Sequence, residues 1–235
     1  MKKILIFFLM LIVVINVNAI AKKSTTTNTC QEKIIIALIG DSTVTDDVGW
    51  GKSFAKRFND KVKVLNFSIK GSSSKSFYDK KFYIPALKAK PDYVLIQFGH
   101  NDQPGKGPDR ETDPSTTYSY YLFLYVKMFQ EIGAKPILVS SVTRRTFGKN
   151  GKISPSLLPW ANAVRRLATE IKVPFIDLHT ASINFHNKIG EKASMKLNAE
   201  PKDKTHLNQK GADAIANLVV EELKKAEPSL AKYLK

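Results

Sequence analysis

Two segments of the sequence carry side chains that together could perform nucleophilic chemistry. A serine stands in residues 40–43 (GDST), and an aspartate precedes a histidine by three positions in residues 203–206 (DKTH). A serine hydroxyl becomes a nucleophile when an imidazole accepts its proton, and a carboxylate on the other ring nitrogen orients that imidazole. An aspartate and a histidine at this spacing can meet on one tight turn. Ser42, Asp203 and His206 are therefore candidates for a reactive alcohol, an orienting acid and a base.

Two further segments could stabilise negative charge that develops on an oxygen atom. Gly71 lies within a serine-rich stretch, residues 68–74 (SIKGSSS), and Asn101 lies in residues 99–102 (GHND). A glycine lets the backbone approach a ligand closely and turn its N–H group inward. An asparagine amide that points into a cleft can donate a hydrogen bond to an oxyanion.

Each of these segments also has an ordinary structural explanation. Residues 40–43 could cap a helix, residues 68–74 could form a flexible loop, and residues 99–102 could form a turn. The last segment could be a charged loop that ends at Asn208, which is predicted to cap the helix that follows it. The pattern Gly-x-Ser-x-Gly, which places a serine on a sharp strand-to-helix turn in many hydrolases, is absent around Ser42. The remaining histidines are expected to be structural or surface neighbours rather than the base: His100, His179 and His186.

Short apolar runs alternate with helical periodicity and must position these segments. The predicted strands are residues 33–39, 62–67, 93–98, 136–140 and 173–177, and the predicted helices are residues 118–132, 157–171 and 209–225. Strands that are apolar throughout and separated by amphipathic helices indicate a parallel sheet covered on both faces. The sequence therefore predicts an α/β fold, a single-domain three-layer α/β/α sandwich with a central five-stranded parallel sheet. Ligands of such sheets bind beyond the carboxyl ends of the strands, which is where the candidate segments fall.

The order of these segments resembles that of the SGNH (GDSL-type) hydrolases. The resemblance rests on residues 40–43, Gly71, residues 99–102 and residues 203–206, and it spans about residues 34–225. Within that superfamily the sequence is most similar to the rhamnogalacturonan acetylesterases, through the additional matches GWG at 49–51, FGHND at 98–102 and DKTHLN at 203–208. The resemblance implies the flavodoxin-like fold of these hydrolases.

The resemblance also implies a role for each matching residue. Ser42 would be the nucleophile, His206 the general base and then acid, and Asp203 the residue that orients His206. The oxyanion hole would consist of the backbone N–H groups of Ser42 and Gly71 and the side-chain amide of Asn101. No metal ion and no organic cofactor would be needed. One departure from the subfamily is Ser72, which stands where these relatives commonly carry an arginine.

The first residues have the pattern of an export signal. Two lysines precede an apolar run of about a dozen residues, and small residues follow at Ala19 and Ala21. The run is shorter than the roughly 20 apolar residues of a membrane span. We therefore predict a signal peptide over residues 1–21, a flexible lead-in over residues 22–32 and a hydrolase domain over residues 33–235. The mature protein would be periplasmic or extracellular, with no stable membrane insertion, and we expect a monomer.

The charge balance points to an anionic partner. The chain has 37 Lys and Arg against 21 Asp and Glu, a formal net charge of +16. A basic rim attracts polyanions and concentrates them near a site. The basic residues expected at this rim are Lys70, Lys75, Lys80, Lys81, Arg144, Arg145, Lys149 and Lys152. Three aromatic residues in the same region could offer flat faces to sugar rings: Tyr78, Phe82 and Tyr83.

These observations favour a secreted serine esterase that removes acetyl groups from an acidic plant polysaccharide such as rhamnogalacturonan. Alternatives with the same residues are esterases for acetylated xylan or oligosaccharides, lysophospholipids or thioesters. A basic module that binds nucleic acid or anionic glycans is a third class, but no nucleic-acid-binding motif is present, and we expect no nucleic-acid partner. The single cysteine, Cys30, excludes an intrachain disulfide and a cysteine-based zinc site.

Overall fold

A computed structural model describes residues 33–235. The predicted signal peptide (1–21) and lead-in (22–32) lie outside the described residues. Five parallel strands form one sheet in the order β2-β1-β3-β4-β5. The strands are β1 (Ile34–Gly40), β2 (Val62–Asn66), β3 (Tyr93–Gln97), β4 (Lys135–Val139) and β5 (Phe175–Ile176). The predicted five-stranded parallel sheet is confirmed.

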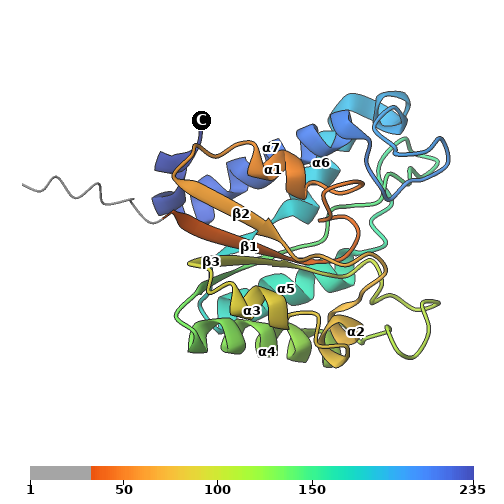
Figure 1. Cartoon of the computed structure of the whole chain (residues 1–235). Coiled ribbons are helices and arrows are strands. Elements are labelled where there is room, and N and C mark those ends of the chain that lie inside the picture. Colours follow the sequence, from red (N-terminus) through yellow and green to blue (C-terminus); the bar gives the residue numbers. More distant parts are fainter. Residues whose placement is uncertain (1–32) are drawn as a thin grey trace, which may run out of the picture. The chain divides into compact units, whose positions relative to one another are not determined.

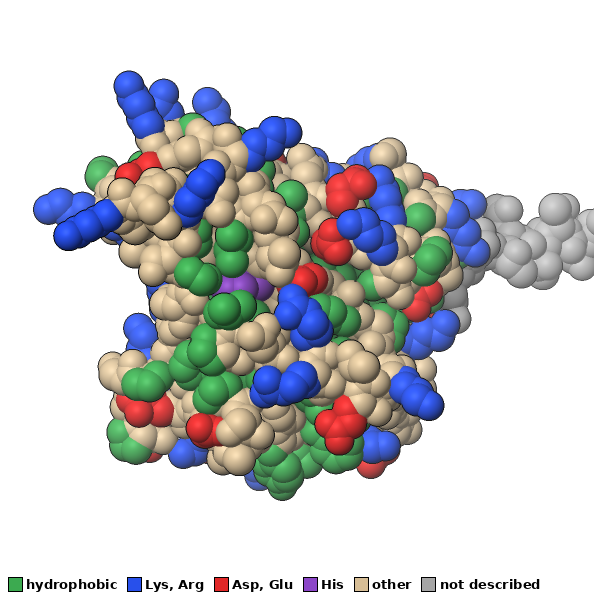
Figure 2. All heavy atoms as spheres, turned by 180° about the vertical axis from the view of Figure 1, so that it is seen from behind, with side chains coloured by type: hydrophobic (Ala, Val, Ile, Leu, Met, Phe, Trp, Pro, Cys, Tyr) green, Lys and Arg blue, Asp and Glu red, His purple; other side chains and the backbone are tan. Residues whose placement is uncertain are grey.

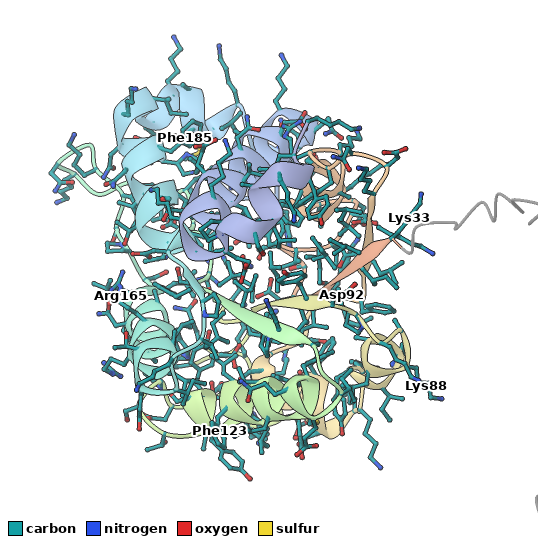
Figure 3. All side chains as sticks on the ribbon, turned by 90° about the vertical axis from the view of Figure 1, so that its left-hand side faces the viewer. Lys33, Lys88, Asp92, Phe123, Arg165 and Phe185 are labelled. Carbon is teal, nitrogen blue, oxygen red and sulfur yellow. The ribbon has the colours of Figure 1, made fainter. Side chains whose placement is uncertain are left out.

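Helices cover both faces of this sheet, which gives three layers (Figures 1 and 3). One face carries α1 (Gly51–Ala55), α6 (Leu178–Met195) and α7 (Gln209–Ala226). The other face carries α2 (Ser74–Asp79), α3 (Ile84–Lys88), α4 (Thr117–Glu131) and α5 (Leu158–Glu170). A 3₁₀ helix, η1 (Pro228–Tyr233), follows α7. The predicted helices 118–132, 157–171 and 209–225 correspond to α4, α5 and α7.

Alternate residues of β1 pack into two separate hydrophobic cores. Ile36 and Leu38 pack into the core with Phe54 of α1 and the apolar face of α7, whereas Ala37 and Ile39 pack into the core beneath α4 and α5. All four strand residues are fully buried. Successive side chains of a strand point to opposite faces, so a strand covered on both faces must be apolar at every position.

The strand order also explains where a site can form. The chain crosses from β1 to β2 on one side and then returns to β3 on the other side of β1. Gly40 at the end of β1 is paired in register with Gln97 at the end of β3. The loops that leave two such neighbouring strands diverge, and the space between them is the usual ligand site of an open α/β sheet.

Two details differ from the sequence prediction. Strand β5 contains only Phe175–Ile176, because it lies at the edge of the sheet beside β4 alone and Pro174 has no N–H group to donate. The alternative that residues 40–43 cap a helix does not hold, since a turn follows β1 and α1 begins only at Gly51.

Candidate active site

The side chains of three residues from distant parts of the chain form a continuous hydrogen-bonded row. Nε2 of His206 lies 2.8 Å from Oγ of Ser42, and Nδ1 of His206 lies 2.7 Å from Oδ2 of Asp203. The other carboxylate oxygen of Asp203 accepts hydrogen bonds of 2.9 and 2.8 Å from the backbone N–H groups of His206 and Thr205. Burial raises the pKa of Asp203, but these backbone donors and the imidazole outweigh it, so the pKa lies below its ordinary value. Asp203 is therefore a carboxylate that can hold a proton on Nδ1 of His206.

A buried polar network holds the turn that carries Ser42. Oδ1 of Asp41 accepts hydrogen bonds from the backbone N–H and the hydroxyl of Thr43, at 2.9 and 2.7 Å. The hydroxyl of Thr43 in turn accepts a 2.7 Å hydrogen bond from Gln97, whose amide oxygen accepts one of 3.0 Å from the indole of Trp50. All of these side chains are buried. Gln97 was not among the predicted site residues, although a glutamine inside the apolar run 93–98 (YVLIQF) indicates a buried hydrogen bond.

Arg145 holds the loop that carries Asp203 and His206. Its side chain is fully buried, and Nη2 donates to the backbone oxygens of His206 at 2.5 Å and of Asp203 at 3.2 Å. Nε donates to Oδ1 of Asn198 at 2.5 Å. The prediction that Arg145 lies on an exposed basic rim is therefore wrong, because the guanidinium points inward and satisfies carbonyl groups of an irregular loop. At the end of this loop Asn208 caps α7, as predicted, by accepting a hydrogen bond from Gly211.

The segments of Gly71 and Asn101 lie side by side. Nδ2 of Asn101 donates to the backbone oxygen of Ser72 at 3.0 Å, which leaves one amide hydrogen available. Gly71 has a φ angle of +74°, in the region that favours glycine. Within residues 33–235, the backbone N–H groups of Ser42 and Gly71 donate to no protein acceptor. The three predicted oxyanion donors thus all have a free N–H group at the carboxyl edge of the sheet.

Asp102 links these two segments. Its carboxylate accepts hydrogen bonds from the backbone N–H and hydroxyl of Ser74, at 3.0 and 2.5 Å, and one from the hydroxyl of Thr112 at 3.0 Å. Burial raises the pKa of Asp102 to about 7, although the hydrogen bonds from Ser74 and Thr112 oppose the shift. Asp102 was not among the predicted site residues.

The other histidines donate to and accept from no member of this row. His100 is buried with Nδ1 3.6 Å from Oδ2 of Asp41, too far for a hydrogen bond, and burial lowers the pKa of its ring. His179 and His186 are also buried, so they pack inside the protein.

Figure 2 shows histidine surface recessed among hydrophobic and neutral side chains, with lysine and arginine side chains around it.

The aromatic residues that are predicted to face sugar rings pack against other aromatic rings of the protein. The ring of Tyr78 stacks on that of Tyr83 with centroids 5.5 Å apart, and both rings contact Tyr125 of α4. Phe82 packs edge-on against Phe77. These contacts help to attach α2 and the start of α3 to α4, and the three rings are half-buried. That they offer a face to sugar rings stays a prediction.

No cluster of three or more His, Cys, Asp or Glu side chains suited to a metal ion occurs in residues 33–235. No helix in that range has the length and apolar character of a membrane span.

A known protein family covers most of the described residues. The model of the GDSL-like lipase/acylhydrolase family matches residues 35–214. The chain belongs to this family. Membership confirms the resemblance to the SGNH (GDSL-type) hydrolases, and it confirms the expectation of a hydrolytic enzyme.

Named relatives of this GDSL-family chain include carbohydrate esterases. Rhamnogalacturonan acetylesterase RhgT of Bacillus subtilis is 36% identical over 212 residues, covering 81% of this chain and 90% of the relative. A rhamnogalacturonan acetylesterase of Emericella nidulans is 27% identical and covers 77% and 81%. The crystal structure of YxiM from Bacillus subtilis superposes with a TM-score of 0.73 at 26% identity, over 82% of this chain and 56% of that one.

Proposed function

We propose that this GDSL-family chain is a carbohydrate acetylesterase that removes acetyl groups from an acidic plant polysaccharide, rhamnogalacturonan. The observation that carries the proposal is the row from Ser42 through His206 to Asp203, with contacts of 2.8 and 2.7 Å. The substrate class is supported by the names of relatives that are 36% and 27% identical.

In the proposed reaction, Oγ of Ser42 attacks the carbonyl carbon of the acetyl ester while Nε2 of His206 accepts the hydroxyl proton. The resulting oxyanion accepts hydrogen bonds from the backbone N–H groups of Ser42 and Gly71 and from Nδ2 of Asn101. His206 then gives its proton to the departing sugar hydroxyl, which leaves an acetyl group on Ser42. Water, deprotonated by His206, then attacks the acetyl carbonyl carbon. The bond to Oγ of Ser42 breaks, acetate leaves, and His206 returns the proton to Oγ.

The role of Asp203 in this scheme is electrostatic. Its low pKa keeps it ionised, and the 2.7 Å contact holds His206 in the tautomer with the proton on Nδ1. Nε2 is then free to accept the proton of Ser42. The carboxylate also stabilises the imidazolium that forms in both halves of the reaction.

The test is acetate release from acetylated rhamnogalacturonan, acetylated xylan and p-nitrophenyl esters of increasing acyl length. We expect the highest kcat/KM on acetylated rhamnogalacturonan and a steep decline beyond acetyl. The variants Ser42→Ala, His206→Ala and their combination should each lose nearly all turnover, and the double variant should be no worse than either single one. A preference for long acyl chains would favour a lysophospholipase or thioesterase instead.

We also propose that the protein is exported and acts as a monomer. The basis for export is the predicted signal peptide over residues 1–21, which lies outside the described residues. Intact-mass measurement of protein recovered outside the cytoplasm should give a mature chain that begins after Ala21 or Ala19. A full-length chain retained in the cytoplasm would contradict export, and light scattering would test the monomer.

A further inference from the structure

Arg144 connects the two loops that face each other across the candidate active site. The backbone N–H of its neighbour Arg145 donates to the carbonyl oxygen of Lys204 at 2.9 Å, so this stretch runs beside the loop of Asp203 and His206. The guanidinium of Arg144 reaches the loop after β3, where Nη2 donates to the carbonyl oxygen of His100 at 3.2 Å. His100 directly precedes Asn101, so the cation of Arg144 lies close to the proposed oxyanion hole.

The cation of Arg144 has no anionic partner. Within residues 33–235 no carboxylate lies within 4 Å of it, and its acceptors are the neutral oxygens of His100, Gln103 and Ser156. Nε and one hydrogen of Nη2 therefore remain unused by the described part of the chain. Burial lowers the pKa of this guanidinium, and the negative charge of Asp41 opposes the shift. A half-buried cation with no carboxylate at ion-pair distance attracts an anion more strongly than an exposed lysine does.

Two of the lysines expected at the same rim are less suited to binding an anion. Lys70 forms an ion pair with Asp47, and Nζ of Lys75 donates to the carbonyl oxygen of Pro108 at 2.7 Å. Both side chains already have a partner. Arg144 differs from Lys70 in having no carboxylate partner, and it differs from both lysines in placing a planar guanidinium beside the loop of Asn101.

We propose that Arg144 binds a carboxylate of the substrate, supplied by a uronic acid residue on or next to the acetylated sugar. The inference rests on the proposed function and narrows its substrate class to esters with a carboxylate near the acetyl group. A guanidinium with free N–H donors can hold a carboxylate through two hydrogen bonds, which fixes orientation as well as charge. Arg144 would thus be a specificity-determining residue.

The kinetic test compares an acetylated uronate-containing oligosaccharide with an acetylated xylo-oligosaccharide. For Arg144→Gln we expect KM on the acidic substrate to rise about 10- to 100-fold more than KM on the neutral one, the effect of losing a charge-assisted hydrogen bond. Arg144→Lys should recover only part of this difference because it keeps the charge and loses the planar fork. Arg166→Gln removes an exposed arginine from α5 and should leave both KM values at wild-type levels.

A binding test separates this proposal from the proposed function. Calorimetry on Ser42→Ala with an oligogalacturonate that carries no acetyl group should show binding, and Ser42→Ala with Arg144→Gln should show none. Equal binding by the two proteins, or an equal rise of KM on acidic and neutral substrates, would overturn the role of Arg144. Absence of acetate release by the wild type would refute the esterase proposal, and the calorimetry would still decide whether Arg144 binds a carboxylate.

Discussion

The backbone oxygen of His206 lies 2.5 Å from Nη2 of Arg145, a side chain with no exposed surface. Arg145 comes from the segment after β4, whereas His206 comes from the loop before α7. The same guanidinium also contacts the carbonyl oxygen of Asp203 and the side chain of Asn198. One buried cation therefore sets the path of the loop that presents the imidazole to Ser42.

Replacement of Arg145 by glutamine should impair both stability and catalysis. The shorter neutral side chain leaves buried carbonyl groups without a donor, which we expect to lower the free energy of unfolding by about 3 kcal/mol. A loop displaced by about 1 Å should lower kcat about 10²-fold. Urea unfolding and steady-state kinetics test both effects, with Lys149→Gln on the exposed part of the neighbouring loop as a control. Wild-type kcat in Arg145→Gln would show that the loop keeps its path without this cation.

Replacement of Gly71 by alanine should lower kcat through the backbone alone. A Cβ at Gly71 would meet no atom within 4 Å, but the φ angle of +74° costs an L-residue about 1–2 kcal/mol. Rotation that relieves this strain turns the Gly71 N–H away from the oxyanion, and we expect kcat to fall about 10- to 10²-fold. Gly133→Ala has a φ angle of +84° and equally open surroundings, far away at the end of α4. It should lose similar stability and keep its kcat, so an equal loss in both variants would argue against a role for Gly71.

Replacement of Asn101 by alanine should remove one donor to the oxyanion. We expect kcat to fall by about 10²–10³-fold with little change in KM, because the hydrogen bond strengthens only as the oxyanion forms. The exposed Asn184 of α6 provides the matched control as Asn184→Ala. A rise in KM with kcat preserved would instead place Asn101 in ground-state binding of the substrate.

Asp102 should make stability depend on pH. Its pKa of about 7 in the folded protein exceeds the ordinary value of 3.8, so folding takes up a proton between these values. The contribution of Asp102 to stability is therefore fully present below about pH 4 and is lost as the pH rises to about 7, by on the order of 4 kcal/mol at most.

The variant Asp102→Asn isolates this effect because it cannot ionise. We expect the free energy of unfolding of the wild type to decrease, relative to Asp102→Asn, between about pH 4 and about pH 7 and then to level off, as measured by urea unfolding at each pH. Parallel pH profiles for the two proteins would show that Asp102 does not titrate in this range.

The central elements of the fold were accessible from local patterns. The run IIIALIG predicts a buried strand because every position is apolar, and β1 is covered by helices on both faces. Asn208 was recognisable as a helix cap because its side chain acts on a backbone N–H only three residues away. The short β5 was overestimated because apolar residues at a sheet edge resemble those of a longer strand until their partner is known.

The amino-acid sequence by itself determined the strands, the main helices and the identity of the residues that meet at the carboxyl edge of the sheet. These properties depend on periodicity and on side-chain chemistry within a few positions. Only the tertiary structure decided that Arg145 is buried beneath the His206 loop, that Tyr78 and Tyr83 stack on each other, and that Arg144 has no carboxylate beside it. Whether a charge or an aromatic ring is free depends on neighbours that are remote in the chain, and packing alone brings those neighbours together.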